Sequence, residues 1–499
     1  MKRRMLLEML LLAVVNLGTA CGAAAAQEAS SPDFPDTLAG RRMQAFFEAY
    51  AAGTDDALRG FQEDHGRPAP GAVESRIASG AKFRARWGVL TPRLILFSDE
   101  RRLNVLAENV ADKTWMRCEL LLEKDPPHWF GGIGLYPATG PELYIQSHDT
   151  QELAAAVRRF QVAAEVPALA VGTIRGDVIQ TAVAGTRRLG EDEPVAADDR
   201  FHLGSITKSI TATVIGRLIE QERVDWDNTL GELLPDIEMR PEYRDVTVEE
   251  LLQHRAGLPF FPSTHDFRNL VKGSPGDERV AFAAAALQQL EPVVQPRQQF
   301  QYSNAGYAIA GLIAERVSDR TWEELAATEI FAPLGMSTAG LGWPAIAERP
   351  DQPWGHQVGE DGVLRPQQLG QLGLTAPSTP SGDVHCSIED FARFAQLHLQ
   401  GIRGRDGVLR AATIQRLHRA VPVESKGFSY AAGWFVEPQR AHPRHGHGGS
   451  AGWFLAEMFL EPDSNIGVVV AANQRSVIEL RTIADSLLDW LRSQPEAGA

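Results

Sequence analysis

The chain has 499 residues, of which 44% are apolar and 23% are charged, a composition typical of a folded globular protein and not of a disordered or fibrous one. Its 49 basic and 64 acidic residues give a net charge of −15, and no basic run follows the first four residues, which disfavours a nucleic-acid partner. The three cysteines, Cys21, Cys118 and Cys386, are too few and too far apart to predict a disulfide framework or a zinc cluster.

The amino terminus has the pattern of a secretory signal peptide. Three basic residues precede an apolar stretch at 5–17, which is too short to span a membrane, and small residues then offer an Ala-x-Ala cleavage site that ends at Ala26. We therefore expect residues 1–26 to be removed and the mature protein to be periplasmic or secreted, without a transmembrane segment. A second interpretation is an outer-membrane lipoprotein anchored at Cys21, although Gly18 stands where such signals usually carry leucine.

Residues 32–140 are predicted to form a small α+β domain. Apolar residues at helical spacing predict a helix over 38–50 that Gly53 can end, and Asp55 can cap the helix that follows. Alternating or apolar runs then predict strands at 93–97, 103–108 and 114–123. Through its Phe-Phe-x-x-Tyr-x-x-Gly-x-x-x-x-Leu pattern, this part resembles a cystatin-like or NTF2-like accessory domain.

A break in periodicity at 137–149 predicts a linker, and residues 150–492 are predicted to form the main domain. A helix at 152–164 opens it, and the turn Arg175-Gly176-Asp177 joins two apolar runs into a hairpin. Near the other end a second hairpin is predicted at 453–472, and the last helix carries one apolar stripe, formed by Val477, Leu480, Ile483, Leu487 and Leu491. Strands from both ends predict an α+β fold, in which helices flank an antiparallel sheet and a mainly helical region is inserted.

The strongest chemical signal is Ser205-Ile-Thr-Lys208, which stands at the start of an apolar helical pattern. Residues three apart share a helix face, so this spacing brings the lysine amine against the serine hydroxyl. Ser205 can then be a nucleophile and Lys208 its base, provided that burial lowers the lysine pKa by roughly 3 units. Ser-x-x-Lys is expected by chance about twice in a chain of this length, and we interpret a second copy, Ser79-Gly-Ala-Lys82, as a surface coincidence.

Two further motifs follow in order, Tyr302-Ser303-Asn304 and His447-Gly448-Gly449-Ser450. With these three motifs, residues 150–492 resemble the serine β-lactamase and penicillin-binding-protein superfamily, in particular its class C β-lactamase and esterase branch. Stretches at 251–259, 331–336 and 382–387 also resemble that family. The resemblance implies a β-lactamase/transpeptidase-like fold and a serine hydrolase that forms an acyl-enzyme and needs no cofactor.

The resemblance also implies roles for individual residues. Tyr302 would share the proton with Lys208 as general base and later general acid, and Asn304 would hold the amide or ester side of the substrate. A neutral phenol needs a pKa lowered by about 3 units to act as a base by itself, so the lysine has to assist it. Backbone N–H groups of Ser205 and Ser450 would bind the oxyanion.

The third motif departs from the family in a way that bears on the substrate. Where many members carry Lys-Thr-Gly, this chain has His447-Gly448-Gly449, so a permanent cation is replaced by an imidazole that is mostly neutral at pH 7. Gly449 lets a substrate approach the strand closely. The change disfavours anionic β-lactams and favours a small-molecule ester, amide or peptide substrate, as in an esterase, an amidase or a D-aminopeptidase-like enzyme.

Other interpretations stay open at this point. One is a β-lactamase or DD-carboxypeptidase acting on β-lactams or peptidoglycan peptides, and another is a catalytically silent protein that binds cell-wall peptides in the same cleft. The cluster His442, His445 and His447 has no regular ligand spacing, because Pro443 and glycines interrupt it, so we expect no metal site. Cys386 is interpreted as a small buried thiol and not as a nucleophile.

Overall fold

The structure is a computed structural model that describes residues 32–494 except for 69–70, 139, 141–150, 261–272, 360, 370–373, 425–426 and 475–478. The expected signal peptide, Cys21 and Val477 therefore lie outside the described residues. So does most of the expected linker, and the domain boundaries at 26, 32, 140, 150 and 492 stay predictions. Within the described ranges, no helix combines the length and the apolar character that crossing a membrane requires.

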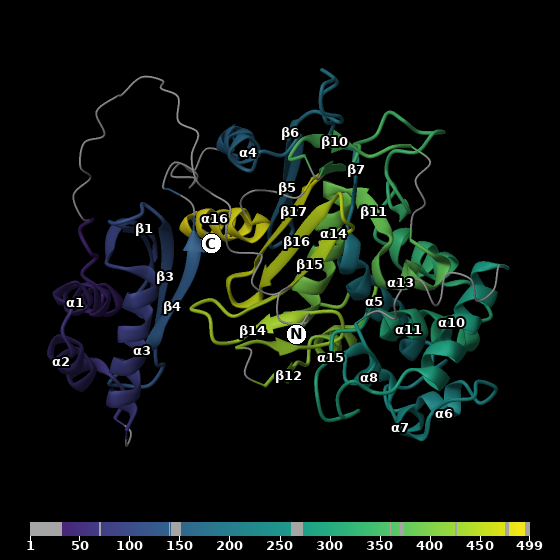
Figure 1. Cartoon of the computed structure of the whole chain (residues 1–499), viewed down its shortest axis with the longest axis horizontal. Helices are drawn as coiled ribbons and strands as arrows, with labels where there is room; N and C mark the ends of the chain where they lie inside the picture. Colours follow the sequence, from purple (N-terminus) through teal and green to yellow (C-terminus); the bar gives the residue numbers. More distant parts are fainter. Residues whose placement is uncertain are drawn as a thin grey trace.

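In the N-terminal unit, residues 32–138, helices pack against a four-stranded antiparallel sheet in the order β1-β2-β3-β4 (Figure 1). Its elements are α1 (Leu38–Ala52), α2 (Asp55–His65), α3 (Ala72–Trp87), β1 (Leu90–Ser98), β2 (Arg102–Asn109), β3 (Trp115–Leu122) and β4 (Phe130–Ala138). The apolar stripe of α1 is buried against the sheet, and Gly53 ends the helix in the left-handed region at φ 79°. The cap of α2 is Thr54, whose hydroxyl accepts from Ala57 N, so the prediction of Asp55 as cap was wrong by one residue.

Two elements of this unit were not predicted from the sequence. Helix α3 buries fully only Ile77, so its apolar pattern is weak. Strand β4 contains three glycines, which break the apolar alternation, and it takes up the first two residues of the expected linker.

The C-terminal unit, residues 151–494, is built on an eight-stranded antiparallel sheet in the order β12-β13-β14-β15-β16-β17-β5-β6. Its strands are β5 (Ala168–Arg175), β6 (Val178–Gly185), β12 (Val421–Pro422), β13 (Ser429–Tyr430), β14 (Phe435–Glu437), β15 (Arg444–Ser450), β16 (Leu455–Glu461) and β17 (Ile466–Ala472). Strand β17 pairs with β5, so the two ends of the segment meet in one sheet, as the hairpin signals predicted. Helices α4 (Gln151–Ala163) and α16 (Leu480–Ser493) cover one face, and α14 (Ile388–Ile402) covers the other.

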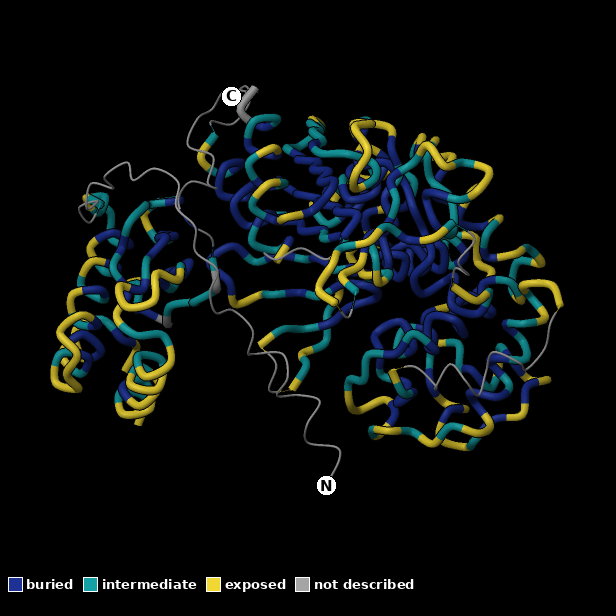
Figure 2. Tube along the Cα trace, turned by 45° about the horizontal axis from the view of Figure 1, so that its top comes forward, coloured by how far each residue is buried: buried dark blue, intermediate teal, exposed yellow. Residues whose placement is uncertain are grey.

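Between β6 and β12 the chain is mainly helical. Besides α14, the helices described there are α5 (Thr207–Glu220), α6 (Leu230–Leu233), α7 (Pro241–Arg244), α8 (Val248–Leu252), α10 (Pro275–Gln289), α11 (Asn304–Ser318), α12 (Trp322–Leu325), α13 (Thr379–Gly382) and α15 (Ala411–Leu417), with the short 3₁₀ helices η2 (Gly204–Ile206) and η4 (Ala376–Ser378) and the π-helix η3 (Ala326–Phe331). Short strands β7 (Arg200–His202), β8 (Gly340–Leu341) and β11 (Val384–Ser387) form one small sheet, and β9 (His356–Val358) pairs with β10 (Leu364–Pro366). Buried residues concentrate in the large sheet and the helices around it, whereas loops and outer helix faces are exposed (Figure 2).

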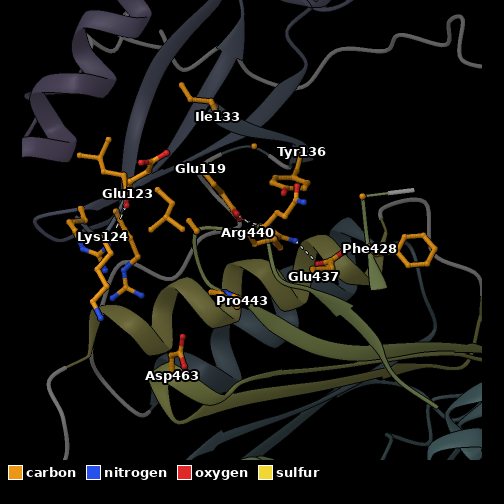
Figure 3. Close-up of a pocket in the computed structure, with 18 residues that line it drawn as sticks. Glu119, Glu123, Lys124, Ile133, Tyr136, Phe428, Glu437, Arg440, Pro443 and Asp463 are labelled. Atoms are coloured by element: carbon orange, nitrogen blue, oxygen red, sulfur yellow. Dashed lines mark hydrogen bonds and ion pairs between the residues drawn. The ribbon is translucent and has the colours of Figure 1, made fainter. Parts of the chain in front are cut away.

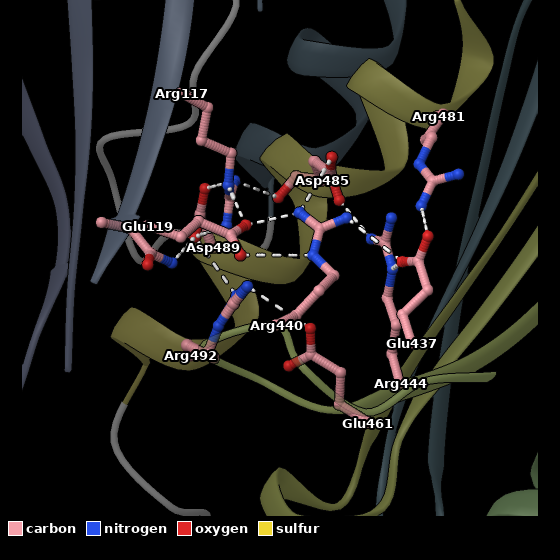
Figure 4. A network of polar contacts seen from close by, with 11 residues as sticks. Arg117, Glu119, Glu437, Arg440, Arg444, Glu461, Arg481, Asp485, Asp489 and Arg492 are labelled. Carbon is pink, nitrogen blue, oxygen red and sulfur yellow. Dashed lines mark hydrogen bonds and ion pairs between the residues drawn. The ribbon is translucent and has the colours of Figure 1, made fainter. Parts of the chain in front are cut away.

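The two units meet through buried charges. Arg117 of β3 pairs with Asp489 of α16, with Nη2 to Oδ1 at 2.8 Å, and Glu119 pairs with Arg440 in the loop between β14 and β15 (Figure 4). Beside this interface a cavity of about 800 Å³ lies between the units, with Tyr136 on one side and Phe428 on the other (Figure 3). The N-terminal unit is therefore bound to the loop that leads into β15.

Candidate active site

The structure brings the first predicted pair together. Ser205 lies in η2, directly before α5, and Lys208 is the second residue of α5. The Lys208 amine is 3.1 Å from Ser205 Oγ and donates to the carbonyl oxygen of Ser381 at 2.7 Å. Its side chain is 0% exposed and has no ion pair with any described residue, so burial lowers the pKa of Lys208 well below 10.5. Burial therefore favours the neutral form of the amine.

Tyr302 completes a three-residue cluster. Its ring centre lies 5.0 Å from the Lys208 amine. Burial raises the pKa of Tyr302 above 10, and the interaction of its hydroxyl with Ser205 offsets this only in part. The phenol therefore keeps its proton at neutral pH, and the electrostatics favour the lysine over the tyrosine as the base.

Asn304 is the first residue of α11, two positions after Tyr302. Ser303 caps this helix by accepting from Gly306 N at 3.2 Å, and the backbone N–H of Asn304 donates to Phe260 O at 3.0 Å. Among the described residues the Asn304 side chain, which is half-buried, has no hydrogen-bond partner. The predicted Tyr-x-Asn motif thus lies at the N-terminus of α11. Its Asn304 amide is not hydrogen-bonded by the described residues.

Strand β15 approaches the nucleophile turn unusually closely. A Cβ atom on Gly449 would clash with Leu203 O and lie 3.2 Å from Ser205 N, and one on Gly204 would lie 2.5 Å from Ser450 N. Gly204 also has φ +53°, a region in which side chains are strained. Both glycines are required by this approach, which places the backbone of Ser205 beside that of Ser450.

His447 belongs to this strand, and its side chain is buried, with 2% of the residue surface exposed. Its Nδ1 is 2.6 Å from Gly448 O, and because a carbonyl only accepts, Nδ1 carries the proton. Nε2 is then the acceptor for the Tyr430 hydroxyl at 3.3 Å. Burial, and secondarily the Lys208 charge, lower the pKa of His447 to about 3, so both ring nitrogens are engaged and the ring is neutral.

Three residues around this cluster had no role assigned from the sequence. His254 accepts from Ser303 N at 3.1 Å, and its ring centre lies 4.3 Å from that of Tyr302; it falls in the family-like stretch at 251–259. Ser381 offers its carbonyl to Lys208, one residue before the stretch at 382–387. Tyr430 fixes His447 and lies in no motif, so no sequence signal could have found it.

The turn that carries Ser205 has its own support. His202 Nδ1 accepts from Gly204 N at 3.1 Å, so Nε2 carries the proton and faces Asp383 Oδ1 at 3.3 Å. Thr207 Oγ1 donates to Gly204 O at 2.8 Å. These contacts hold the backbone of Gly204, directly before Ser205.

The remaining candidates take no part in this cluster. Ser79 and Lys82 are exposed on α3, and Ser79 Oγ donates to Ser75 O at 2.8 Å. His445 contacts His418 at 3.0 Å, and in the part of the chain that the structure describes no three His, Cys, Asp or Glu side chains are grouped to hold a metal ion. Burial raises the pKa of the Cys386 thiol well above 9, and Cys118 is likewise free and buried.

Comparison with known proteins defines the class. The family model described as Beta-lactamase matches residues 153–488, more than half of the chain, and the chain belongs to that family. It is a serine hydrolase with a β-lactamase fold. It is 27% identical over 319 residues to penicillin-binding protein 4 of Amycolatopsis lactamdurans, covering 62% of this chain and 81% of the relative. It is 23% identical to the unguisins hydrolase ungD' of Aspergillus campestris, covering 65% of this chain and 61% of the relative.

Solved structures agree on the fold. The octameric penicillin-binding protein homologue from Pyrococcus abyssi matches with a TM-score of 0.58 and 26% identity, over 69% of this chain and 77% of that one. A D-stereospecific amidohydrolase from Streptomyces sp. matches with a TM-score of 0.54 and 20% identity, over 66% of this chain and 96% of that one. The predicted β-lactamase/transpeptidase-like fold is confirmed.

Proposed function

We propose that this protein is an exported hydrolase that cleaves an ester or amide through an acyl-enzyme at Ser205. The observation that carries the proposal is the 3.1 Å contact between Ser205 Oγ and a buried Lys208 amine that forms no ion pair with a described residue. A neutral amine at hydrogen-bond distance is what a serine hydroxyl needs to lose its proton as it attacks a carbonyl.

In the proposed reaction Ser205 Oγ bonds to the substrate's carbonyl carbon while its proton moves to Lys208. The resulting oxyanion accepts hydrogen bonds from the backbone N–H groups of Ser205 and Ser450, which the close approach of β15 brings side by side. Tyr302 gives its proton to the leaving alcohol or amine as the old bond breaks, and the Lys208 ammonium restores it. Water then attacks the acyl-enzyme, and the same groups return its proton to Ser205.

The proposed substrate carries no carboxylate against His447. A neutral ring with both nitrogens engaged supplies neither charge nor a free N–H, so an anionic β-lactam loses the cation that Lys-Thr-Gly would provide. Esters, amides and D-aminoacyl derivatives lack this requirement, and Asn304 can hold their carbonyl side. Two similar proteins, the unguisins hydrolase and the D-stereospecific amidohydrolase, are named as hydrolases.

The test is a panel of p-nitrophenyl esters, D-aminoacyl anilides and nitrocefin. We expect turnover of an ester or anilide, little turnover of nitrocefin, and a fall of at least 1,000-fold in Ser205→Ala. Ser79→Ala is the matched control, since it alters the second Ser-x-x-Lys copy on an exposed helix and should leave the rate unchanged. Undiminished turnover in Ser205→Ala, or nitrocefin as the best substrate, contradicts the proposal.

Export is proposed from the sequence of residues 1–26. The mass of the N-terminal peptide, measured on protein purified from an expressing bacterium, distinguishes the two processing routes. After cleavage the first residue is Gln27, whereas after lipidation it is an acylated Cys21. Protein that retains Met1 in the cytoplasm contradicts export altogether.

A further inference from the structure

A second cavity lies beside β15, within the C-terminal unit. It has a volume of about 220 Å³ and is lined by three phenyl rings, Phe428, Phe435 and Phe459, and by Arg444 and Glu457 among others. Glu457 lies opposite Gly448 in the β15–β16 ladder, and its carboxyl oxygens are 2.8 and 3.1 Å from where a Cβ on Gly448 would be. The catalytic proposal uses neither charged side chain.

Both charged groups line this space, and each has an atom for which the described residues supply no hydrogen-bond partner. Arg444 is 1% exposed, and its Nη2 has no hydrogen-bond partner among the residues that the structure describes, although its Nε donates to Glu437 and its Nη1 pairs with Asp485 (Figure 4). Glu457 is half-buried, and no hydrogen bond or ion pair joins it to a residue in the described ranges. A buried donor without an acceptor is costly, so a ligand that supplies one is stabilised there.

The charges of the lining define the complementary ligand. Arg444 and Arg481 are positive, Glu437 and ionised Glu457 are negative, and Glu437 is already paired with both arginines. A ligand with a single charge would unbalance the site, whereas a zwitterion preserves its neutrality. A cavity of about 150 Å³ is enough for the six heavy atoms of benzene, so this one holds roughly nine heavy atoms.

We propose that this cavity is a binding site for a free α-amino acid with an apolar side chain. The carboxylate accepts from Arg444 Nη2, the ammonium donates to the Glu457 carboxylate, and the side chain packs among the phenyl rings. The cavity shares His447 and Gly448 with the third motif of the active site but is not lined by Ser205, so binding requires no reaction there.

The affinity for the amino acid should fall as the pH falls below 7. Burial raises the pKa of Glu457 to about 7, with Arg481 and Arg444 opposing the shift and Glu479 and Asp485 adding to it. Because the ammonium pairs with the ionised carboxylate, the ligand lowers this pKa on binding. The dissociation constant should therefore increase up to tenfold per pH unit below pH 7 and level off above it.

The experiment is calorimetric titration of the full chain, as Ser205→Ala, with leucine of either hand. Leucinamide lacks the carboxylate and N-acetyl-leucine lacks the ammonium, and we expect each to bind at least tenfold more weakly than leucine. The proposal is overturned if N-acetyl-leucine binds as tightly as leucine. It is also overturned if neither leucine enantiomer binds at any concentration in a tenfold dilution series up to the solubility limit.

A pair of variants locates the binding. Glu457→Gln keeps the shape but removes the charge, and it should weaken leucine binding at least tenfold and abolish its pH dependence. Glu461→Gln is the matched control, because Glu461 is buried on the same strand, has a pKa also raised by burial, and does not line the cavity. Leucine affinity that is unchanged in Glu457→Gln, or reduced equally in both variants, contradicts the assignment. Since Ser205 is absent from every protein used, the result is independent of the proposed reaction.

Discussion

Lys208 owes its chemistry to what surrounds it. A lysine in water keeps its proton far above neutral pH, and a nearby carboxylate would strengthen that preference. Here the amine is enclosed and its recorded partners, Ser205 Oγ and Ser381 O, are uncharged. Burial therefore acts without opposition, and the same burial acts in the reverse sense on Tyr302, whose phenol it keeps protonated. The two residues are pushed apart in pKa, as the proposed division into base and acid requires.

The first prediction at this scale is the pH profile of kcat/KM. A base is active when deprotonated, and a lowered pKa populates that form at lower pH, so the rate should rise with pH through a midpoint well below 10.5. Tyr302→Phe should lower the rate about 10²- to 10⁴-fold, the usual worth of one proton-transfer group, without moving this midpoint far. A rate that rises only near pH 10 would show that Lys208 is an ordinary ammonium.

A second prediction concerns the residue that the sequence did not reveal. Tyr430→Phe removes the donor to His447 Nε2 and leaves a buried acceptor without a partner, which should lower the free energy of unfolding by about 1–3 kcal/mol. The nitrogen chemical shift of His447 Nε2 should also change as it loses its hydrogen bond, while Nδ1 stays protonated toward Gly448 O. Tyr243→Phe is the matched control. The Tyr243 hydroxyl donates to Leu290 O over 2.9 Å and takes no part in this cluster. The control variant should cost similar stability yet leave activity intact; equal losses of activity would contradict a specific role for Tyr430.

At the scale of elements, the site depends on two segments being held in contact. Strand β14 pairs with β15 only from Arg444 to Gly446, and beyond that point β15 lies against η2. The contact is between backbones, so glycines and not side-chain chemistry make it. The strand can thus serve both as a wall for substrate and as a source of N–H groups.

Gly449→Ala tests this contact. The added methyl would clash with Leu203 O and separate β15 from η2, and a displacement of about 1 Å at reacting groups can cost about 10²-fold in rate. Gly60→Ala is the control, because that glycine lies in helix α2 with open space around its Cβ position. Circular dichroism verifies that both variants fold. Full activity in Gly449→Ala would mean that the close approach is not needed for catalysis.

Elements with a strong periodic pattern were predictable from the sequence, and weakly patterned ones were not. The β5–β6 hairpin and helix α16 follow from turn residues and an apolar stripe, and both are present. Helix α3 and strand β4 were missed because one buries little and the other is rich in glycine. Their formation depends on the rest of the unit, which a local pattern does not contain.

At the scale of the whole molecule, the N-terminal unit is joined to the hydrolase through charge. Figure 4 labels five arginines and five carboxylates, and burial of such groups is tolerable only while every charge keeps its partner. Arg440 and Arg444 flank the loop into β15, so this network extends to the strand beside Ser205. A change in the N-terminal unit can therefore alter the position of β15.

The network predicts an acid transition. The guanidinium charges of Arg440 and Arg117 overcome burial and hold the pKa of Glu119 at about 2. A depressed pKa stabilises the fold above the unfolded value of 4.5, and that contribution, about 3 kcal/mol, is lost as the pH falls toward 2. Glu119→Gln should remove this part of the pH dependence of unfolding, whereas Glu63→Gln, exposed on α2, should not. Identical acid profiles for all three proteins would contradict a stabilising role for the network.

The site itself was predictable in part. The positions of Ser205, Lys208, Tyr302 and His447 follow from motifs, because each motif is local. The hydrogen bonds that engage His447 Nε2 and the Lys208 amine come from Tyr430 and Ser381, the latter 173 positions away from the lysine. Such contacts depend on the folded chain, so no spacing rule could supply them.

The most direct test of the central claim is mass spectrometry of the protein after brief exposure to a p-nitrophenyl ester or a fluorophosphonate. A single acyl or phosphonyl adduct should form, map to the peptide containing Ser205, and be absent from Ser205→Ala while persisting in Ser79→Ala. An adduct on another residue, or continued turnover without Ser205, would contradict the account.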